Sequence, residues 1–185
     1  TACAPEFGRV EELEVDALII GGGPSGLAAA AELGKLNVNT LVVDDKAALG
    51  GKLVLQTHKF FGSVEDCYAG TRGVDIATKL EGRLKDYPSV KVWTNASCLA
   101  VFSDRKAGIL RGDKYYLVRP KAVISATGAR EKSLAFPGNT LPGVYGAGAF
   151  QTLVNRDLVR PAKRLFIVGG GNVGLIAAYH ALQAG

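Results

Sequence analysis

The stretch ALIIGGGPSGLAAAAEL, residues 17–33, decides the fold of the first part of this chain. Its four apolar residues predict a buried strand, its GxGxxG spacing predicts a tight turn, and the Ala- and Leu-rich run predicts a helix. A similar stretch, LFIVGGGNVGLIAAYHAL, occupies residues 165–182. Each stretch therefore predicts a strand–turn–helix unit in which the start of the helix can hold a phosphate group.

The residues of the first turn have separate roles. Gly21 allows the sharp turn out of the strand, Gly23 lets the backbone approach a pyrophosphate, and Gly26 lets the helix pack closely on the strand. Pro24 and Ser25 lie at the start of the helix, where free N–H groups and the helix dipole favour an anion. The corresponding residues of the second turn are Gly169, Gly171, Asn172, Val173 and Gly174.

An acidic residue lies where a dinucleotide site requires one. The run NTLVV, residues 39–43, predicts a second strand, and Asp44 follows it, 18 positions after Gly26. In dinucleotide-binding folds an acid about 20 residues beyond the glycines hydrogen-bonds the ribose. A carboxylate would repel a 2′-phosphate, so Asp44 favours FAD or NAD over NADP at this site. A strand–turn–helix without a ligand is the alternative, and the position of Asp44 argues against it.

The composition is typical of a globular protein with a substantial core, since 48% of the residues are hydrophobic. The 22 Lys and Arg against 17 Asp and Glu give a net charge of +5. No block of five or six like charges occurs, so we expect no nucleic-acid partner. The apolar runs are too short for a membrane span, and residues 1–7 lack the features of a signal peptide.

The three cysteines, Cys3, Cys67 and Cys98, are isolated, and no CxxC motif occurs. An odd number of cysteines without a pairing pattern indicates a reducing compartment, which predicts a cytoplasmic protein without an internal redox disulfide. We expect Cys67 to be half-buried and structural, with a reactive thiol as the alternative.

Between the two turns the chain alternates strands and helices. The pattern predicts a helix over 74–84, strands over 90–94 and 121–125, and a small β-meander that includes 98–102 and 115–118. This alternation predicts an α/β fold with a parallel sheet covered on both faces.

Taken in order, the two glycine turns, Asp44, Gly50-Gly51-Lys52 and Ala126-Thr127-Gly128 resemble the two-dinucleotide-binding flavoproteins of the pyridine nucleotide–disulfide oxidoreductase type. The resemblance covers nearly the whole chain. It implies that the first turn holds FAD, with Asp44 on its ribose, and that the second turn holds NAD(P)H.

The same resemblance implies further contacts with FAD. The backbone at Cys98 would touch the adenine, and Thr127 and Gly128 would lie beside FAD where the chain leaves the first domain. Gly51 and Lys52 would lie near the pyrophosphate and flavin.

The implied fold class is α/β, with a Rossmann-like FAD-binding domain that has a parallel sheet and a small β-meander. The first βα unit of a second Rossmann-like, NAD(P)-binding domain follows it. We expect a linker or tail over 1–14, the first part of the FAD-binding domain over 15–130, and the connection and truncated start of the second domain over 131–185. The chain is thus interpreted as a piece of a longer protein.

A narrower resemblance lies in residues 136–154, FPGNTLPGVYGAGAFQTLV. This segment is similar to one in the large subunits of sarcosine oxidase, dye-linked proline dehydrogenase, opine oxidase and hydrogen cyanide synthase. It implies an oligomeric assembly with electron-transfer subunits and a nicotinamide nucleotide or a small amine or imino acid as substrate. Residues 53–62 depart from that group, which leaves the substrate open.

The function implied is movement of hydride or electrons through FAD, between NAD(P)H or a small organic donor and an acceptor. His58 is the candidate general acid or base, because the pKa of histidine suits that role. The alternative for His58, and the favoured interpretation of His180, is a hydrogen-bonding or surface role. Two other functions remain open: a non-catalytic nucleotide-binding or electron-transfer subunit, and a Rossmann protein that binds no flavin.

Overall fold

The computed structural model describes residues 10–185, and the chain divides into two compact units. The first unit contains the chain up to Leu49 together with Leu80–Thr127. The second unit contains Gly50–Lys79 and Gly128–Gly185. The segment 50–79 therefore belongs with the C-terminal part of the chain.

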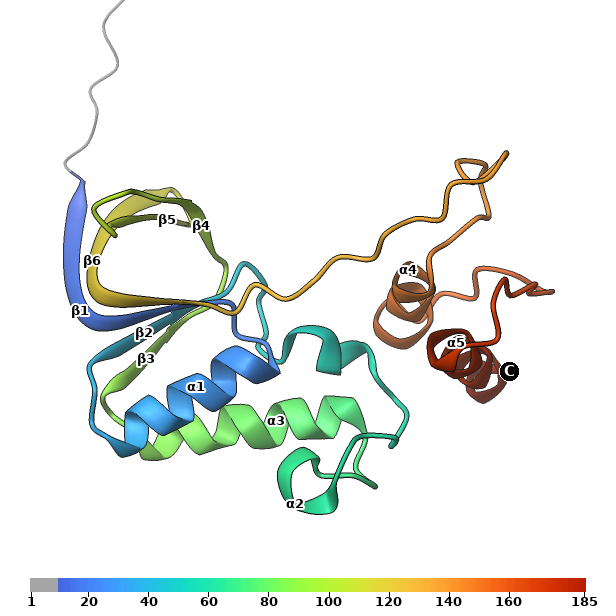
Figure 1. The fold of residues 1–185 in the computed structure, drawn as a ribbon, viewed down its shortest axis with the longest axis horizontal. Helices are drawn as coiled ribbons and strands as arrows, with labels where there is room; N and C mark the ends of the chain where they lie inside the picture. Colours follow the sequence, from blue (N-terminus) through green and yellow to red (C-terminus); the bar gives the residue numbers. More distant parts are fainter. Residues whose placement is uncertain (1–9) are drawn as a thin grey trace, which may run out of the picture. The chain divides into compact units, whose positions relative to one another are not determined.

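The first unit is built on a six-stranded sheet in the described residues, with the strand order β3-β2-β1-β6-β5-β4 (Figure 1). Strands β1, β2, β3 and β6 pair in parallel, whereas β4, β5 and β6 form an antiparallel meander. This arrangement confirms the predicted α/β class with a parallel sheet and a β-meander. The strands are β1 Glu11–Ile20, β2 Thr40–Val43, β3 Val90–Trp93, β4 Ala96–Val101, β5 Ala107–Arg111 and β6 Lys114–Ser125.

The two faces of the sheet are covered differently. Successive side chains of a strand point to opposite faces, so neighbouring residues of β1 lie in different cores. Leu18 packs with Ile109 of the meander. Ile19 packs on the other face with Leu27 and Ala30 of helix α1, Pro24–Lys35. Figure 1 shows α1 beneath the sheet and the meander curling over the opposite face.

The remaining elements are helices, most of them wholly or partly in the second unit. They are η1 Gly51–Leu55, α2 Val64–Cys67, α3 Gly73–Arg83, η2 Leu84–Asp86, α4 Ala147–Gln151, η3 Thr152–Arg156 and α5 Asn172–Ala184. The element η3 is one turn of π-helix that continues α4 directly.

The sequence prediction divides the meander differently from the structure. The strands expected over 115–118 and 121–125 are one strand, β6, which continues through Pro120. Pairing between β5 and β6 ends at Val118, so no N–H is needed on that side of Pro120. The prediction also lacks β5, because Gly108 interrupts its apolar run; that glycine leaves room for the ring of Tyr115.

Two further expectations differ from the structure. Residues 11–14, expected in a tail, begin β1 and pair with β6, while residues 1–9 of that tail lie outside the described residues. The strand expected over 165–168 does not form in the described part of the chain. No described strand pairs with it, and a strand needs a neighbouring backbone for its hydrogen bonds. Phe166 is accordingly 89% exposed.

The core of the first unit provides a direct test of this packing. Leu18 is fully buried, whereas Leu36, just beyond α1, is 74% exposed. Leu18→Ala should lower the free energy of unfolding by about 2–5 kcal/mol, because it removes apolar contacts and leaves a cavity. Leu36→Ala should change it by less than about 0.5 kcal/mol. Chemical denaturation measures both values, and equal losses would contradict the packing described.

Candidate functional site

The first glycine turn joins β1 to α1 in a conformation that only glycines permit. Gly21 has a φ of 106°, in the left-handed region. A side chain on Gly21 would collide with the carbonyl oxygen of Ala126, and one on Gly26 would collide with the carbonyl oxygen of Gly21. The start of α1 therefore lies directly against the end of β1.

The start of α1 has backbone N–H donors without a partner among the described residues. The Leu27 N–H donates to the Gly23 carbonyl at 2.9 Å, so the N–H groups of Ser25 and Gly26 precede the first intrahelical bond. Gly23 caps the helix without a side-chain hydrogen bond, and the first turn of α1 has no acidic residue. Pro24 and Ser25 are exposed. The positive end of the helix dipole is therefore available to an anion.

Asp44, at the end of β2, is held beside this turn. Its carboxylate accepts hydrogen bonds from the N–H of Gly22 at 2.7 Å and from the N–H of Lys46 at 2.9 Å. Its side chain is largely buried, with an exposed fraction of 9% for the residue. Each carboxylate oxygen has a second acceptor position, so the acid can hold the turn and accept further hydrogen bonds. Sequence reasoning missed both donors because a backbone N–H leaves no sequence signal.

Other predicted residues lie around the same end of the sheet. The Ala126 N–H donates to the Ile20 carbonyl at 2.8 Å, which brings the exposed Thr127 next to the turn. The Ala96 N–H donates to the Asp44 carbonyl at 2.9 Å, so β4, which contains Cys98, begins beside the acid. Cys98 is half-buried, and burial raises the pKa of its thiol. The thiol therefore stays protonated at neutral pH.

Three predicted glycine or lysine residues lie at the start of the second unit or at its junction with the first. Gly51 has a φ of 53° and begins η1, followed by the exposed Lys52. Gly128, with a φ of 74°, is the first residue after the second stretch of the first unit. Contacts of these residues with a cofactor stay predictions.

The second glycine turn repeats the backbone of the first. Gly169 has a φ of 101°, and a side chain on Gly174 would collide with the carbonyl oxygen of Gly169. The Leu175 N–H donates to the Gly171 carbonyl at 3.0 Å, as in the first turn. Asn172 and Val173 occupy the exposed first positions of α5, which also lacks an acid in its first turn.

The two turns differ in their surroundings. A side chain on Gly21 would meet Ala126, which directly follows β6, whereas one on Gly169 would meet nothing within 4 Å among the described residues. The second turn thus has the local geometry for binding phosphate without a sheet beside it.

His58 lies away from solvent in the second unit, with an exposed fraction of 5%. Its ring stacks on Phe61, with centroids 4.7 Å apart, and its Nδ1 accepts the N–H of Phe60 at 3.1 Å. The structure gives His58 a packing and hydrogen-bonding role, and its catalytic role stays a prediction. Cys67 is exposed, which corrects the expectation of a half-buried residue. It ends the short helix α2, which buries none of its residues.

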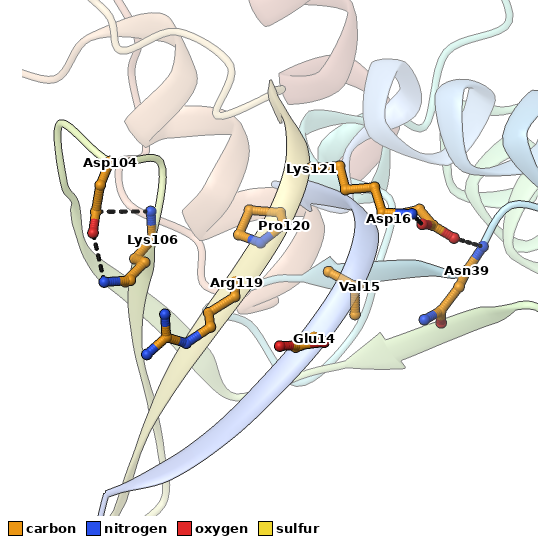
Figure 2. A pocket seen from close by; sticks show the side chains of 9 residues that line it. All are labelled: Glu14, Val15, Asp16, Asn39, Asp104, Lys106, Arg119, Pro120 and Lys121. Atoms are coloured by element: carbon orange, nitrogen blue, oxygen red, sulfur yellow. Dashed lines mark hydrogen bonds and ion pairs between the residues drawn. The ribbon is translucent and has the colours of Figure 1, made fainter.

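A separate open pocket of about 580 Å³ lies along the middle of β1 and β6 and the turn before β5 (Figure 2). Each basic side chain that lines the pocket forms an ion pair with a carboxylate. Lys106 pairs with Asp104 and Lys121 with Asp16, both at 2.6 Å, and Arg119 pairs with Glu12 at 2.7 Å. It does not include the glycine turn, so we assign no nucleotide to it. The residues that line it are Glu14, Val15, Asp16, Asn39, Asp104, Lys106, Arg119, Pro120 and Lys121.

Within residues 10–185, no helix is long and apolar enough to cross a membrane. No group of three or more His, Cys, Asp or Glu side chains in the same range is placed to hold a metal ion.

Comparison with known proteins identifies the family. The family model of pyridine nucleotide-disulphide oxidoreductases matches residues 15–185. The chain belongs to this family. It is an FAD-dependent oxidoreductase family, which confirms the resemblance inferred from the two turns.

Its relatives include proteins that are named as enzyme subunits. Hydrogen cyanide synthase subunit HcnB of Pseudomonas protegens is 30% identical over 86% of this chain and 34% of the relative. Sarcosine oxidase subunit alpha of Rhizobium meliloti is 28% identical over 92% of this chain and 18% of the relative. L-proline dehydrogenase from P. horikoshii has a similar structure, with a TM-score of 0.83 and 26% identity over 96% of this chain and 35% of that protein. The chain thus spans about a third or less of the length of each.

The contact between Gly26 and Gly21 can be tested by adding one methyl group. Gly26→Ala should lower the free energy of unfolding by about 1–3 kcal/mol or more, because the new atom meets backbone that cannot move freely. Gly82→Ala in α3 is the matched control. A side chain there meets nothing within 4 Å, so the change should stabilise the helix by up to about 1 kcal/mol. Thermal or chemical unfolding gives the sign of each effect, and a stabilised Gly26→Ala variant would rule out the close approach.

Proposed function

We propose that the protein moves hydride or electrons through FAD, between NAD(P)H or a small amine or imino-acid donor and an acceptor. The observation that carries this proposal is the repetition of one turn geometry at Gly21–Gly26 and Gly169–Gly174. One such turn suffices for one dinucleotide. Two turns in one chain of this family support two dinucleotides, FAD at the first and NAD(P)H at the second.

The residues of the first unit fit the diphosphate and ribose of FAD. The free N–H groups at the start of α1 would bind the pyrophosphate. Asp44, already fixed by Gly22 and Lys46, would accept hydrogen bonds from the ribose hydroxyls. Thr127 and the backbone near Cys98 would border the cofactor on either side of the turn. FAD, when bound, would supply the hydride and electron chemistry, while these residues fix its orientation.

The second turn would bind the nicotinamide nucleotide through the start of α5. The donors at Asn172 and Val173 are exposed, and the helix dipole there is not offset by an acid in the first turn. Family membership and the named relatives support a further proposal, that this chain works beside partner subunits. The amino-acid-derived substrates named in those relatives make amines and imino acids the first donors to test.

The function itself is tested by an absorbance spectrum of the purified protein, before and after anaerobic addition of NADH and NADPH. We expect flavin bands that bleach with at least one nucleotide. Bands that persist with both would overturn the nucleotide-linked reaction and favour an organic donor or a subunit that only binds nucleotides. A protein that shows no flavin bands even after addition of FAD would contradict the whole proposal.

The role of Asp44 is tested by Asp44→Asn. The amide keeps one acceptor oxygen, which can serve the Gly22 N–H, but it loses the oxygen that accepts from the Lys46 N–H and the charge that strengthens hydrogen bonds to the ribose. A hydrogen bond to a charged group contributes about 1.5–3 kcal/mol, so FAD affinity should fall at least about tenfold. Asp45→Asn is the matched control, because Asp45 is exposed and pairs only with Lys46 among the described residues. Equal FAD affinities of the two variants, measured by titration of flavin fluorescence, would remove Asp44 from the site.

The assignment of the two turns is tested by a second pair of glycine variants. Gly174→Ala should abolish bleaching by NAD(P)H while the flavin spectrum is kept, because it deforms only the turn before α5. Gly26→Ala should lower the FAD content instead. Stopped-flow reduction and flavin content measure the two effects separately. Loss of FAD in Gly174→Ala, in a variant that folds, would contradict the assignment.

A further inference from the structure

The two histidines of the sequence lie side by side in the second unit. His58 follows η1, and His180 lies in the second half of α5. Their ring centroids are 5.6 Å apart with an interplanar angle of 22°. His180 has no exposed surface, and His58 is 5% exposed. Two titratable groups are thus stacked away from water, although 122 positions separate them in the chain.

Both rings accept a hydrogen bond at Nδ1. The Phe60 N–H donates to Nδ1 of His58 at 3.1 Å. The side-chain amide nitrogen of Asn155 lies 3.0 Å from Nδ1 of His180, and it also donates to the Leu55 carbonyl at 2.7 Å. An amide nitrogen is only a donor, so Nδ1 of His180 is the acceptor. Both rings therefore carry one proton, on Nε2, and are neutral.

The pair connects three segments of the second unit. Asn155 belongs to the π-helical turn η3, a rare conformation that often occurs at functional sites. Through Asn155, this turn holds both Leu55 and His180. Gln56 donates to Gln151 at 3.0 Å, and Thr57 donates to Gln183 at 3.1 Å. The contacts of His180 and Gln183 thus hold α5 against residues 55–58 and against η3.

Among residues 10–185, neither ring forms an ion pair or a hydrogen bond with a carboxylate. Nε2 of His180 and Oε1 of Gln56 are buried without a partner among the described residues. The charged or titratable neighbours in the chain are Lys59 beside His58, Tyr179 beside His180, and Arg156 beside Asn155. Arg156 pairs with Asp157 at 2.7 Å, and the Tyr179 ring lies 6.2 Å from that of His180. Burial lowers the pKa of both histidines, and His58 lowers that of His180 further.

We propose that the His58–His180 pair is a proton-operated latch, in which protonation of either ring at Nδ1 releases α5 from residues 55–58 and from η3. A proton on Nδ1 turns that atom from an acceptor into a donor, so it faces the N–H of Phe60 or the amide nitrogen of Asn155, neither of which can accept a hydrogen bond. A second proton, on the other ring, would then place two positive charges on rings whose centroids are 5.6 Å apart. The latch stands on these contacts alone and does not depend on the identity of any cofactor.

The direction of the pH dependence follows from linkage. The pKa of each ring in the closed form lies below its value of about 6.5 in the open form, so the open form binds more protons between the two values. The closed form is therefore at its full stability above about pH 6.5 and loses stability as the pH falls. Each histidine can change the ratio of open to closed forms by up to about tenfold per pH unit.

Hydrogen exchange of the α5 amides between pH 5 and 7.5, corrected for the intrinsic pH dependence of exchange, tests the latch in the intact protein. We expect α5 to open more as the pH falls below about 6.5, while the amides of β1 in the first unit keep their protection. The double variant His58→Asn and His180→Asn keeps an acceptor near each Nδ1 but cannot titrate, so its α5 should open with no such pH dependence. The comparison uses the change of α5 opening with pH and not the absolute exchange rate, so a general loss of stability in the variant does not obscure the result.

Two results of the exchange experiment would overturn the latch. One is exchange in α5 that is independent of pH in the unmodified protein, and the other is an equal slope in the double variant. An NMR titration of the two imidazole rings provides a second readout. We expect both rings to stay neutral at pH 6.5, and a pKa at or above 6.5 for both in the folded protein would also exclude the proposal.

Discussion

The start of α1 lies so close to the end of β1 that a single added methyl group would not fit between them. Gly26 faces the carbonyl oxygen of Gly21, and Gly21 faces that of Ala126 at the end of β6. Three backbone segments therefore converge at one end of the sheet. This convergence places the free N–H groups of α1 at the carboxyl ends of the parallel strands, where nucleotides bind in open α/β sheets.

The same constraint explains how a carboxylate is kept largely buried next to a helix start. A buried charge is costly unless it is hydrogen-bonded, and Asp44 is bonded to the N–H groups of Gly22 and Lys46. Gly22 can offer its N–H because the turn exposes its backbone on the side of β2. The acid thus stabilises the turn before any ligand arrives. A ribose would then add hydrogen bonds to a group whose orientation is already fixed, which reduces the entropy cost of binding.

The sequence predicts the features that depend on neighbouring residues and misses those that depend on distant ones. The glycine spacing and the apolar run before it suffice for β1, α1 and the place of Asp44, because each follows from short-range sterics and periodicity. The course of β6 through Pro120 was not predictable in this way, since a proline is tolerated there only because β5 has already ended. The contact of His58 with His180 could not be predicted from the sequence either, because it also depends on a distant part of the chain. Each histidine is isolated in sequence, and only the packing of α5 brings the rings together.

The second turn shows which features of the glycine turn depend on the local sequence and which depend on neighbouring strands. Residues 165–168 form no strand within the described range, yet Gly169 and Gly174 reproduce the dihedral angle and the close approach seen at Gly21 and Gly26. The same turn geometry thus occurs at both places, once beside a described strand and once without one. At the first turn the sheet adds two neighbouring residues. Ala126 lies against Gly21, and Asp44 accepts a hydrogen bond from Gly22. At the second turn the described chain supplies donors for a phosphate but no acid for a ribose. Local sequence thus encodes a turn whose N–H groups could bind a phosphate, whereas a choice among nucleotides would depend on the strand that lies alongside.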